Sequence, residues 1–287
     1  MLQYNPKCLY GIRIKTKKVN YLLDYHLHST YSPDGEMTMD EACNRAIEAG
    51  LKEIAITDHM DIDLPDNKAA FQIEDLDQYF NDLISTKNRF QDKLKVKAGI
   101  EFGLQDWTLQ EASRIINAYS WDFVIASVHL VNGEDPYYRY YFNSRDKIKS
   151  YTDYYETILM LLKDYNDFNV LGHLDYLRRY SPYEYSLEDH LIGKEIIEEI
   201  LIMLVQKGKG LEVNTAGFKH YSGQPHPHPD ILKWFRELGG EIITIGSDAH
   251  SVNYVGYETA RALECLRYAG FSYVTSFTEM KPVFIKI

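Results

Sequence analysis

The chain has few cysteines and no motif in which cysteines bind zinc or build a disulfide framework. Its 287 residues include three cysteines, Cys8, Cys43 and Cys265, which are widely spaced and form no Cys-x-x-Cys pair. Any metal site in this protein must therefore use nitrogen and oxygen ligands.

The sequence also lacks long apolar runs and an excess of basic charge. No apolar stretch approaches the ~20 residues that cross a bilayer, and the N-terminus has no apolar core followed by a cleavage site. Lysine and arginine total 31 against 42 aspartates and glutamates, and this net charge of −11 would repel a nucleic-acid backbone. We therefore expect a cytoplasmic protein that neither enters a membrane nor binds nucleic acid in general.

No linker rich in proline, glycine or serine divides the chain, and no internal repeat is visible. The composition, with 45% hydrophobic and 25% charged residues, is that of a packed globular protein. From about residue 21, short β-rich runs alternate with helical patterns in one series. We predict one domain over residues 21–287, preceded by an N-terminal extension over residues 1–20.

Seven or eight units of strand followed by helix are predicted in this series. The predicted strands cover residues 20–26, 53–57, 95–101, 122–128, 169–173, 210–214 and 241–245, and a short run over 271–275 ends the chain. The predicted helices cover residues 38–50, 75–90, 153–164, 188–207, 230–238 and 257–269. Such alternation predicts the α/β class with a parallel sheet, most simply a closed TIM-like barrel, with a doubly wound open sheet as the alternative.

Metal-competent or polar side chains stand at the carboxyl end of every main predicted strand. In parallel α/β folds these ends meet at one face of the sheet, where ligands bind. A single histidine after a strand is more often a structural residue, but a whole set of them without a metal would be costly to bury. The set, in chain order, is His26, His28, Asp58, His59, Glu101, His129, His173, Asn214, Asp248 and His250.

Imidazole and carboxylate ligands of this kind suit Zn²⁺, Mn²⁺ or Fe²⁺. The set exceeds the four ligands of one tetrahedral site, so it predicts more than one ion. A polynuclear centre of this type supports hydrolysis, because the ions lower the pKa of a bound water and neutralise charge on a phosphoryl or carbonyl group. The ions would also make the pocket locally positive in an acidic protein.

Seven short motifs from about residue 21 onward occur in the order found in a known enzyme superfamily. The chain resembles the polymerase-and-histidinol-phosphatase (PHP) superfamily and, within it, the PHP-type histidinol-phosphate phosphatases. The matching stretches are residues 25–35, 56–59, 99–103, 126–129, 171–175, 212–217 and 245–250.

The resemblance implies a distorted (β/α)7 TIM-like barrel that holds three divalent ions, Zn, Mn or Fe. The implied ligands are His26, His28, Glu101 and Asp248 for the first ion, Glu101, His129 and His173 for the second, and Asp34, His59 and His250 for the third. Glu101 would bridge the first two ions, and Asp34 stands where some relatives have histidine. Asp58 would orient a neighbouring ligand rather than bind an ion.

The same resemblance implies a phosphomonoesterase that hydrolyses L-histidinol phosphate to L-histidinol and phosphate in histidine biosynthesis, by attack of a metal-bridging hydroxide. Asp248 and His250 are both candidates for proton transfer. A related barrel could instead act on nucleotides, oligonucleotides or another small phosphomonoester. An inactive barrel used as a binding module is disfavoured, because its expected sign, the loss of several ligands, is absent.

Further candidates for substrate binding follow the fifth and sixth predicted strands. Arg178, Arg179 and Lys219 could bind phosphate oxygens, although Arg178 and Arg179 also fit a solvated pair at a helix start. Asn214 is a further candidate at the end of the sixth strand. Among the 24 tyrosines, a group that includes Tyr137 and Tyr140 could line a pocket for an imidazole or another ring.

Overall fold

The computed structural model describes residues 21–65, 71–220 and 222–287. The N-terminal extension expected over residues 1–20 lies outside the described residues. In the part of the chain that is described, no helix is long and apolar enough to cross a membrane.

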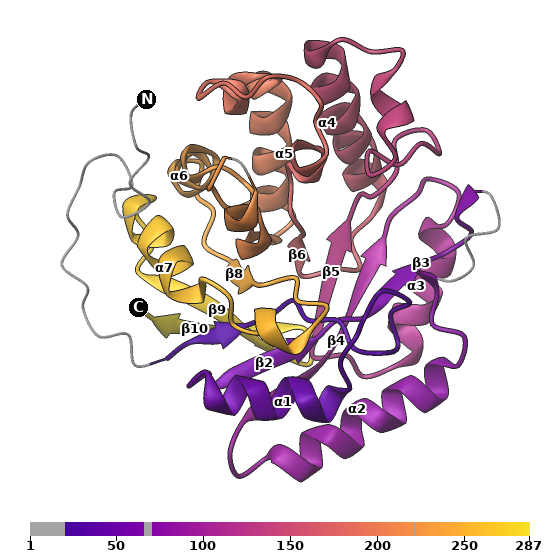
Figure 1. Ribbon diagram of the computed structural model, residues 1–287, viewed down its shortest axis with the longest axis vertical. Helices are drawn as coiled ribbons and strands as arrows, with labels where there is room; N and C mark the ends of the chain where they lie inside the picture. Colours follow the sequence, from indigo (N-terminus) through magenta and orange to yellow (C-terminus); the bar gives the residue numbers. More distant parts are fainter. Residues whose placement is uncertain (1–20, 66–70, 221) are drawn as a thin grey trace.

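Seven parallel strands occupy the centre of the molecule, and helices surround them (Figure 1). The strands, in hydrogen-bonded order, are β1 (Leu23–Asp24), β2 (Glu53–Ile56), β4 (Lys95–Gly103), β5 (Phe123–Ser127), β6 (Val170–Leu171), β7 (Gly210–Asn214) and β8 (Ile243–Gly246). A further short strand, β3 (His59–Asp61), continues the line of β2 and pairs with the second half of β4.

The first and last barrel strands are joined by main-chain hydrogen bonds at their carboxyl ends. The N–H of Tyr25 donates to the carbonyl of Ile245 at 2.8 Å, and the N–H of Asp248 donates to the carbonyl of His26 at 2.8 Å. The sheet therefore forms a nearly closed barrel. This confirms the (β/α)7 prediction and excludes the open, doubly wound sheet.

Helices connect the strands and cover the outside of the barrel (Figure 1). They are α1 (Met39–Glu48), α2 (Leu76–Phe90), α3 (Leu109–Ala118), α4 (Lys147–Asp164), α5 (Lys194–Gln206), α6 (Pro229–Glu237) and α7 (Thr259–Tyr268). Helix α1 begins with a capping box, in which the Thr38 side chain accepts from the N–H of Glu41 and the Glu41 carboxylate accepts from the N–H of Thr38.

The structure differs from the predicted elements in several places. Strand β3 and helix α3 were not predicted, and helix α4 begins at Lys147 rather than near residue 153. Helix α5 begins at Lys194 rather than near residue 188, because Gly193 adopts a left-handed φ of 71° and residues 189–191 form a separate 3-10 turn. The last predicted strand is neither an eighth barrel strand nor the end of the chain, since β9 (Tyr273–Thr278) pairs in antiparallel fashion with β10 (Lys281–Lys286).

A buried hydrogen-bond network around Glu53 ties the barrel to β9. The Glu53 carboxylate accepts hydrogen bonds from the hydroxyls of Tyr25 and Ser276, and from Tyr21 at 2.6 Å. The Tyr25 hydroxyl in turn accepts from the N–H of Phe277 at 2.9 Å. Tyr25 is fully buried, so its hydroxyl satisfies groups that water does not reach.

Replacing Tyr25 with phenylalanine should therefore lower the stability of the barrel more than the same replacement at Tyr165. Tyr25→Phe leaves the Glu53 carboxylate and the Phe277 N–H short of a partner, and we expect the free energy of unfolding to fall by about 1–3 kcal/mol. The matched control is Tyr165→Phe, because Tyr165 is equally buried but its hydroxyl, within the described part of the chain, makes one long hydrogen bond, to the carbonyl of Asp167 at 3.3 Å. Urea unfolding followed by circular dichroism measures the free energy of unfolding of both variants. Equal losses of this free energy would contradict the role assigned to the Tyr25 hydroxyl.

Candidate metal centre

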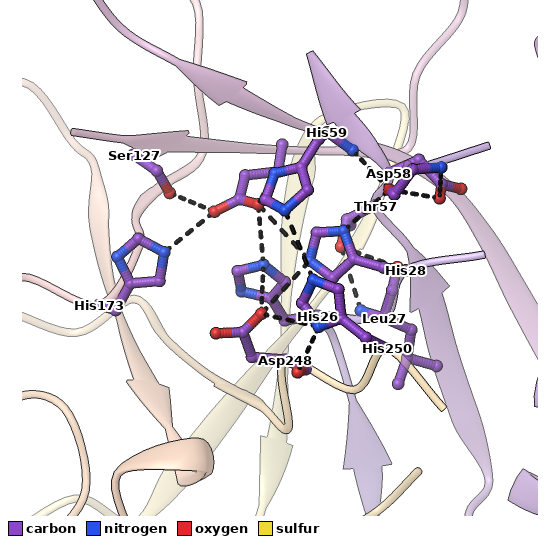
Figure 2. Close-up of polar contacts among 12 residues, drawn as sticks. His26, Leu27, His28, Thr57, Asp58, His59, Ser127, His173, Asp248 and His250 are labelled. Carbon is purple, nitrogen blue, oxygen red and sulfur yellow. Dashed lines mark hydrogen bonds and ion pairs between the residues drawn. The ribbon is translucent and has the colours of Figure 1, made fainter. Parts of the chain in front are cut away.

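The predicted metal ligands meet at the carboxyl end of the barrel (Figure 2). Each strand ends beneath the cluster, so residues within a few positions of a strand end are held on short, ordered segments. The structure brings together all of the predicted ligands, which are His26, His28, Asp34, His59, Glu101, His129, His173, Asp248 and His250.

Glu101, on β4, lies at the centre of the cluster and is fully buried. Its Oε2 atom lies 3.2 Å from Nε2 of His26, 3.5 Å from Nε2 of His28 and 2.9 Å from Nδ1 of His59. One carboxylate oxygen therefore faces histidines that come from the ends of two different strands.

The other oxygen of Glu101 faces a second pair of histidines. Its Oε1 atom lies 3.1 Å from Nε2 of His173 and 3.5 Å from Nε2 of His129, and it accepts a hydrogen bond from the Ser127 hydroxyl at 2.6 Å. Glu101 can therefore offer one oxygen to each of two ions, which is what a bridging ligand requires.

Asp248 completes the first group of ligands from the opposite side. Its Oδ1 atom lies 3.4 Å from Nε2 of His28 and 3.7 Å from Nε2 of His26, and its Oδ2 atom is paired with Nη2 of Arg179 at 2.7 Å. The backbone of Asp248 has a left-handed φ of 53°, an uncommon conformation for a residue other than glycine. Residues held in such conformations cluster at functional sites, where the surrounding structure maintains them.

The third predicted group is the most exposed of the three. Nε2 of His250 lies 3.3 Å from Oδ2 of Asp34 and 3.5 Å from Nε2 of His59, and His59 also lies 4.0 Å from Asp34. The side chain of Asp34 is 45% exposed, whereas those of Glu101 and His28 are completely buried. This group therefore opens toward solvent, and the Glu101 groups lie beneath it.

The donor atoms of the cluster fit divalent metal ions. Nε2 of His26, Nε2 of His28, Nδ1 of His59 and Oε2 of Glu101 are all buried and, among the described residues, have no hydrogen-bond partner. Buried polar atoms rarely lack partners unless an ion or water supplies them. Several groups of three donors lie within 4.8 Å of one another, including His26, His28 and Glu101. The cluster could therefore hold metal ions.

The charges of the cluster shift the pKa values of its members in opposite directions. Burial acts to lower the pKa of His26, but the charges of Glu101 and Glu212 outweigh burial and raise that pKa well above its usual value. Burial, together with His250 and His59, lowers the pKa of His28 well below its usual value. Opposed shifts within one site are typical of active sites.

Carboxylates outside the ligand set orient the histidines. Glu212 accepts from Nδ1 of His26 at 2.6 Å and from the N–H of His173 at 2.8 Å, and Asp61 accepts from Nδ1 of His129 at 2.8 Å. Such contacts fix which ring nitrogen faces an ion. Neither carboxylate was predicted as a site residue from the sequence, although Asp61 stands two positions after His59, on the same face of β3.

Asp58 acts as the sequence analysis expected, at one remove from the cluster. Its carboxylate accepts from the N–H of Ser29 at 2.6 Å and from the hydroxyl of Ser32 at 2.7 Å. The Ser32 hydroxyl lies 3.1 Å from Nδ1 of His28. Asp58 therefore holds the loop that positions His28 (Figure 2).

The structure separates the two adjacent arginines that were predicted to bind substrate. They lie in a 3-10 turn, Tyr176–Arg179, in which successive side chains point about 120° apart. Arg179 contacts Asp248 and lines a cavity of about 290 Å³ above the cluster. Among the described residues that line this cavity, Arg178 is absent: it pairs with Asp175 at 2.5 Å and lines a neighbouring cavity.

Of the other two predicted substrate-binding residues, Asn214 contacts Arg179, whereas Lys219 lies farther away. The Asn214 amide oxygen accepts from Nη2 of Arg179 at 2.9 Å, and its amide nitrogen donates to Oδ2 of Asp248 at 3.3 Å. The ammonium of Lys219 lies 3.5 Å from the ring centre of Tyr254, outside the described lining of the cavity. Asn214 therefore holds Arg179 against Asp248, whereas Lys219 packs on an aromatic ring.

Comparison with known proteins agrees with this architecture. The family model for the PHP domain matches residues 24–216. A histidinol-phosphatase from Lactococcus lactis subsp. lactis strain IL1403 is 33% identical over 260 residues, which span 90% of this chain and 95% of that protein. A probable histidinol-phosphatase from Clostridium acetobutylicum strain ATCC 824 is 31% identical over 268 residues, or 92% of this chain and 97% of that protein.

A solved structure matches over the same length. The crystal structure of histidinol phosphate phosphatase from Lactococcus lactis, complexed with zinc, L-histidinol and phosphate, has a TM-score of 0.81. It is 32% identical in sequence and covers 91% of this chain and 98% of that one. The matched family model extends from β1 past the end of β7 and includes most of the clustered ligands. This chain therefore belongs to the PHP family.

Proposed function

We propose that this protein is a metal-dependent phosphomonoesterase that hydrolyses L-histidinol phosphate to L-histidinol and phosphate. The observation that carries the proposal is the joint lining of one cavity by His59, His129, His173, Asp248 and His250, with Arg179 on its wall. Divalent ions held by imidazole and carboxylate ligands, together with the guanidinium, would surround a phosphoryl group with the positive charge that its oxygens need.

The ligand groups would hold three ions, with Zn²⁺, Mn²⁺ and Fe²⁺ as the matching metals. Glu101 would be shared between the group with His26, His28 and Asp248 and the group with His129 and His173; the third group is Asp34, His59 and His250. When bound, such ions lower the pKa of water and neutralise charge on a phosphoryl group.

The residues around the ions supply orientation and proton transfer. Arg179 presents its guanidinium to the cavity, and Asn214 and Asp248 fix its direction by contacts of 2.9 and 2.7 Å. Asp248 and His250 both line the cavity, which supports each of them as a candidate for moving a proton at the leaving oxygen. Nδ1 of His250 donates to the carbonyl of Asp248 at 3.0 Å, which leaves Nε2 directed toward Asp34.

The choice of substrate is supported by the relatives. The Lactococcus lactis protein is named as a histidinol-phosphatase, and its crystal structure contains zinc, L-histidinol and phosphate. The match covers 91% of this chain and 98% of that one, so it extends well beyond the barrel strands. A shared barrel alone would not support a shared substrate, because one fold hosts many activities.

Steady-state phosphate release from a panel of phosphoesters tests the proposal. We expect kcat/KM for L-histidinol phosphate to exceed that for AMP and for bis(4-nitrophenyl) phosphate by at least about 100-fold, because cavity contacts that fit one alcohol do not fit another. The Zn, Mn and Fe contents of the same preparation should rise with activity. Equal or better hydrolysis of AMP would show that the protein is a hydrolase with a substrate other than L-histidinol phosphate.

Changing Glu101 to glutamine tests the metal centre. Glu101→Gln keeps the shape of the side chain but removes the charge that two groups of ligands share, so we expect a loss of bound metal and a fall in kcat/KM of about 1,000-fold or more. Glu111→Gln is the control, because the Glu111 side chain is 44% exposed and pairs with Arg114, away from the cluster. Metal stoichiometry by mass spectrometry measures both variants, and full metal content in Glu101→Gln would refute the assigned ligand role.

The two adjacent arginines should behave differently when each is changed to lysine. Arg179→Lys loses the planar fork that faces the cavity, and we expect kcat/KM for L-histidinol phosphate to fall about 10- to 100-fold. Arg178→Lys weakens the pair with Asp175 in the neighbouring cavity, so it should lower the thermal midpoint and leave kcat/KM within about threefold of wild type. Similar losses of activity in the two folded variants would contradict the assignment of Arg179.

A further inference from the structure

A buried carboxylate and a buried imidazole link two loops beside the metal cluster. Oδ1 of Asp175 accepts from Nδ1 of His226 at 2.5 Å, and both side chains are almost completely buried. Asp175 follows β6, whereas His226 lies in the segment between β7 and α6. The hydrogen bond therefore ties together two loops whose contacting residues are 51 positions apart in the chain.

The direction of this hydrogen bond follows from the charges around it. Oδ2 of Asp175 pairs with Nη1 of Arg178 at 2.5 Å, which keeps the carboxylate ionised. Burial lowers the pKa of His226 to about 4, because it outweighs the opposing effect of Asp175. The ring is therefore neutral near pH 7 and carries one proton. Since an ionised carboxylate can only accept, that proton lies on Nδ1.

The shortness of β6 explains why such a link is needed. Strand β6 has two residues, and its ladder with β7 ends at the pair of Leu171 and Leu211. Arg179 stands beyond this point, at the end of a 3-10 turn that begins directly after Asp175. The ladder between the two strands therefore does not fix where Arg179 lies relative to β7.

A closed ring of contacts fixes the position of Arg179 instead. Asp175 holds His226, and the main chains of His226 and Asn214 exchange two hydrogen bonds of 2.7 and 2.9 Å. The side-chain oxygen of Asn214 accepts from Nη2 of Arg179 at 2.9 Å. The 3-10 turn completes the ring, because the N–H of Arg178 donates to the carbonyl of Asp175 at 3.0 Å. Arg179 is thus held through its main chain and through its guanidinium.

The His226 ring is packed tightly enough to maintain this arrangement. The residue is 1% exposed. A Cβ atom at Gly217, in the turn that follows Asn214, would lie 2.8 Å from Cδ2 of His226, which is closer than side-chain carbons approach. The imidazole is therefore clamped between this turn and the Asp175 carboxylate.

We propose that Asp175 and His226 are positioning residues for Arg179. Their hydrogen bond places Asn214, and Asn214 directs the guanidinium of Arg179 to the wall of the cavity above the cluster. Neither Asp175 nor His226 is among the described residues that line this cavity. The inference rests on the proposed phosphomonoesterase function, in which Arg179 faces the phosphoryl group, and it extends phosphate recognition to two residues outside the cavity.

Two substitutions of His226 separate this hydrogen bond from packing. His226→Asn keeps an N–H near the position of Nδ1, whereas His226→Leu is larger than asparagine but cannot donate. We expect His226→Leu to lower kcat/KM for L-histidinol phosphate about 10-fold, mainly through KM, and His226→Asn to stay within about threefold of wild type. A role in packing alone would give the opposite order, because asparagine leaves the larger void.

Combination with Arg179→Lys shows whether the effect passes through Arg179. In the Arg179→Lys background, His226→Leu should change kcat/KM by less than about threefold, because the contact that it disturbs is already lost. Losses that multiply in the double variant would overturn the proposal. Loss of bound metal in folded His226→Leu would also overturn it, because the effect would then act on the ligands.

His190→Leu is the matched control. His190 is likewise a mostly buried histidine beside a carboxylate, with Nε2 3.3 Å from Oδ2 of Asp230, but it lies in the 3-10 turn before α5. Its kcat/KM should stay within about threefold of wild type. If His226→Leu does not fold, His226→Gln replaces it and should give the same losses, because its amide lies one bond farther out than Nδ1.

A binding measurement separates this inference from the proposed function. Calorimetric titration of the metal-loaded protein with inorganic phosphate should give an affinity that His226→Leu weakens about 10-fold and that His226→Asn keeps within about threefold. If the wild-type protein releases phosphate from none of the esters, the proposed function fails, and this titration still decides the role of the pair. Equal phosphate affinities of wild type and His226→Leu would refute it.

Discussion

One buried carboxylate, that of Glu101, is the group on which the arrangement of the site depends. Its two oxygens face histidines that come from different strands, and those histidines lie 2.9–3.5 Å from it. Several of the facing atoms have no hydrogen-bond partner among the described residues. A buried cluster of this kind is costly unless cations fill the space between the donors. Divalent ions, which the cluster could hold, would therefore stabilise the carboxyl end of the barrel by balancing the charge and filling the polar contacts of these donors.

The fold holds this cluster in place through short connections and shared hydrogen bonds. The main-chain bond between Asp248 and His26 closes the barrel, and the same two residues supply ligand atoms to the first group. Closure of the barrel therefore also fixes the positions of these two ligands. Glu212 links a further strand end to them, because its carboxylate contacts both the ring of His26 and the main chain of His173. Movement of any one strand end would displace ligands on its neighbours.

The sequence predicted most of the side chains that meet at the carboxyl end of the barrel, because their positions depend on where strands end, and strand ends can be read from local pattern. The features that it missed depend on tertiary contacts or on unusual turns. Asp61 and Glu212 acquire a role only through the histidines they contact. The adjacent arginines separate because of a 3-10 turn. The hairpin of β9 and β10 turns through Glu279 and Met280, which both have positive φ, so the usual glycine or asparagine signal is missing.

The cavity above the cluster is built from two kinds of segment. His59, His129 and His173 lie on a strand or within two residues of a strand end, so altering these positions would disturb the sheet. Tyr137 lines the same cavity from the loop that follows β5, after a turn in which Asn132 and Gly133 have positive φ values. Loops vary in sequence more readily than the strands that they connect. The part of the cavity formed by this loop can therefore change in sequence with less effect on the predicted metal ligands than the part formed by the strand ends.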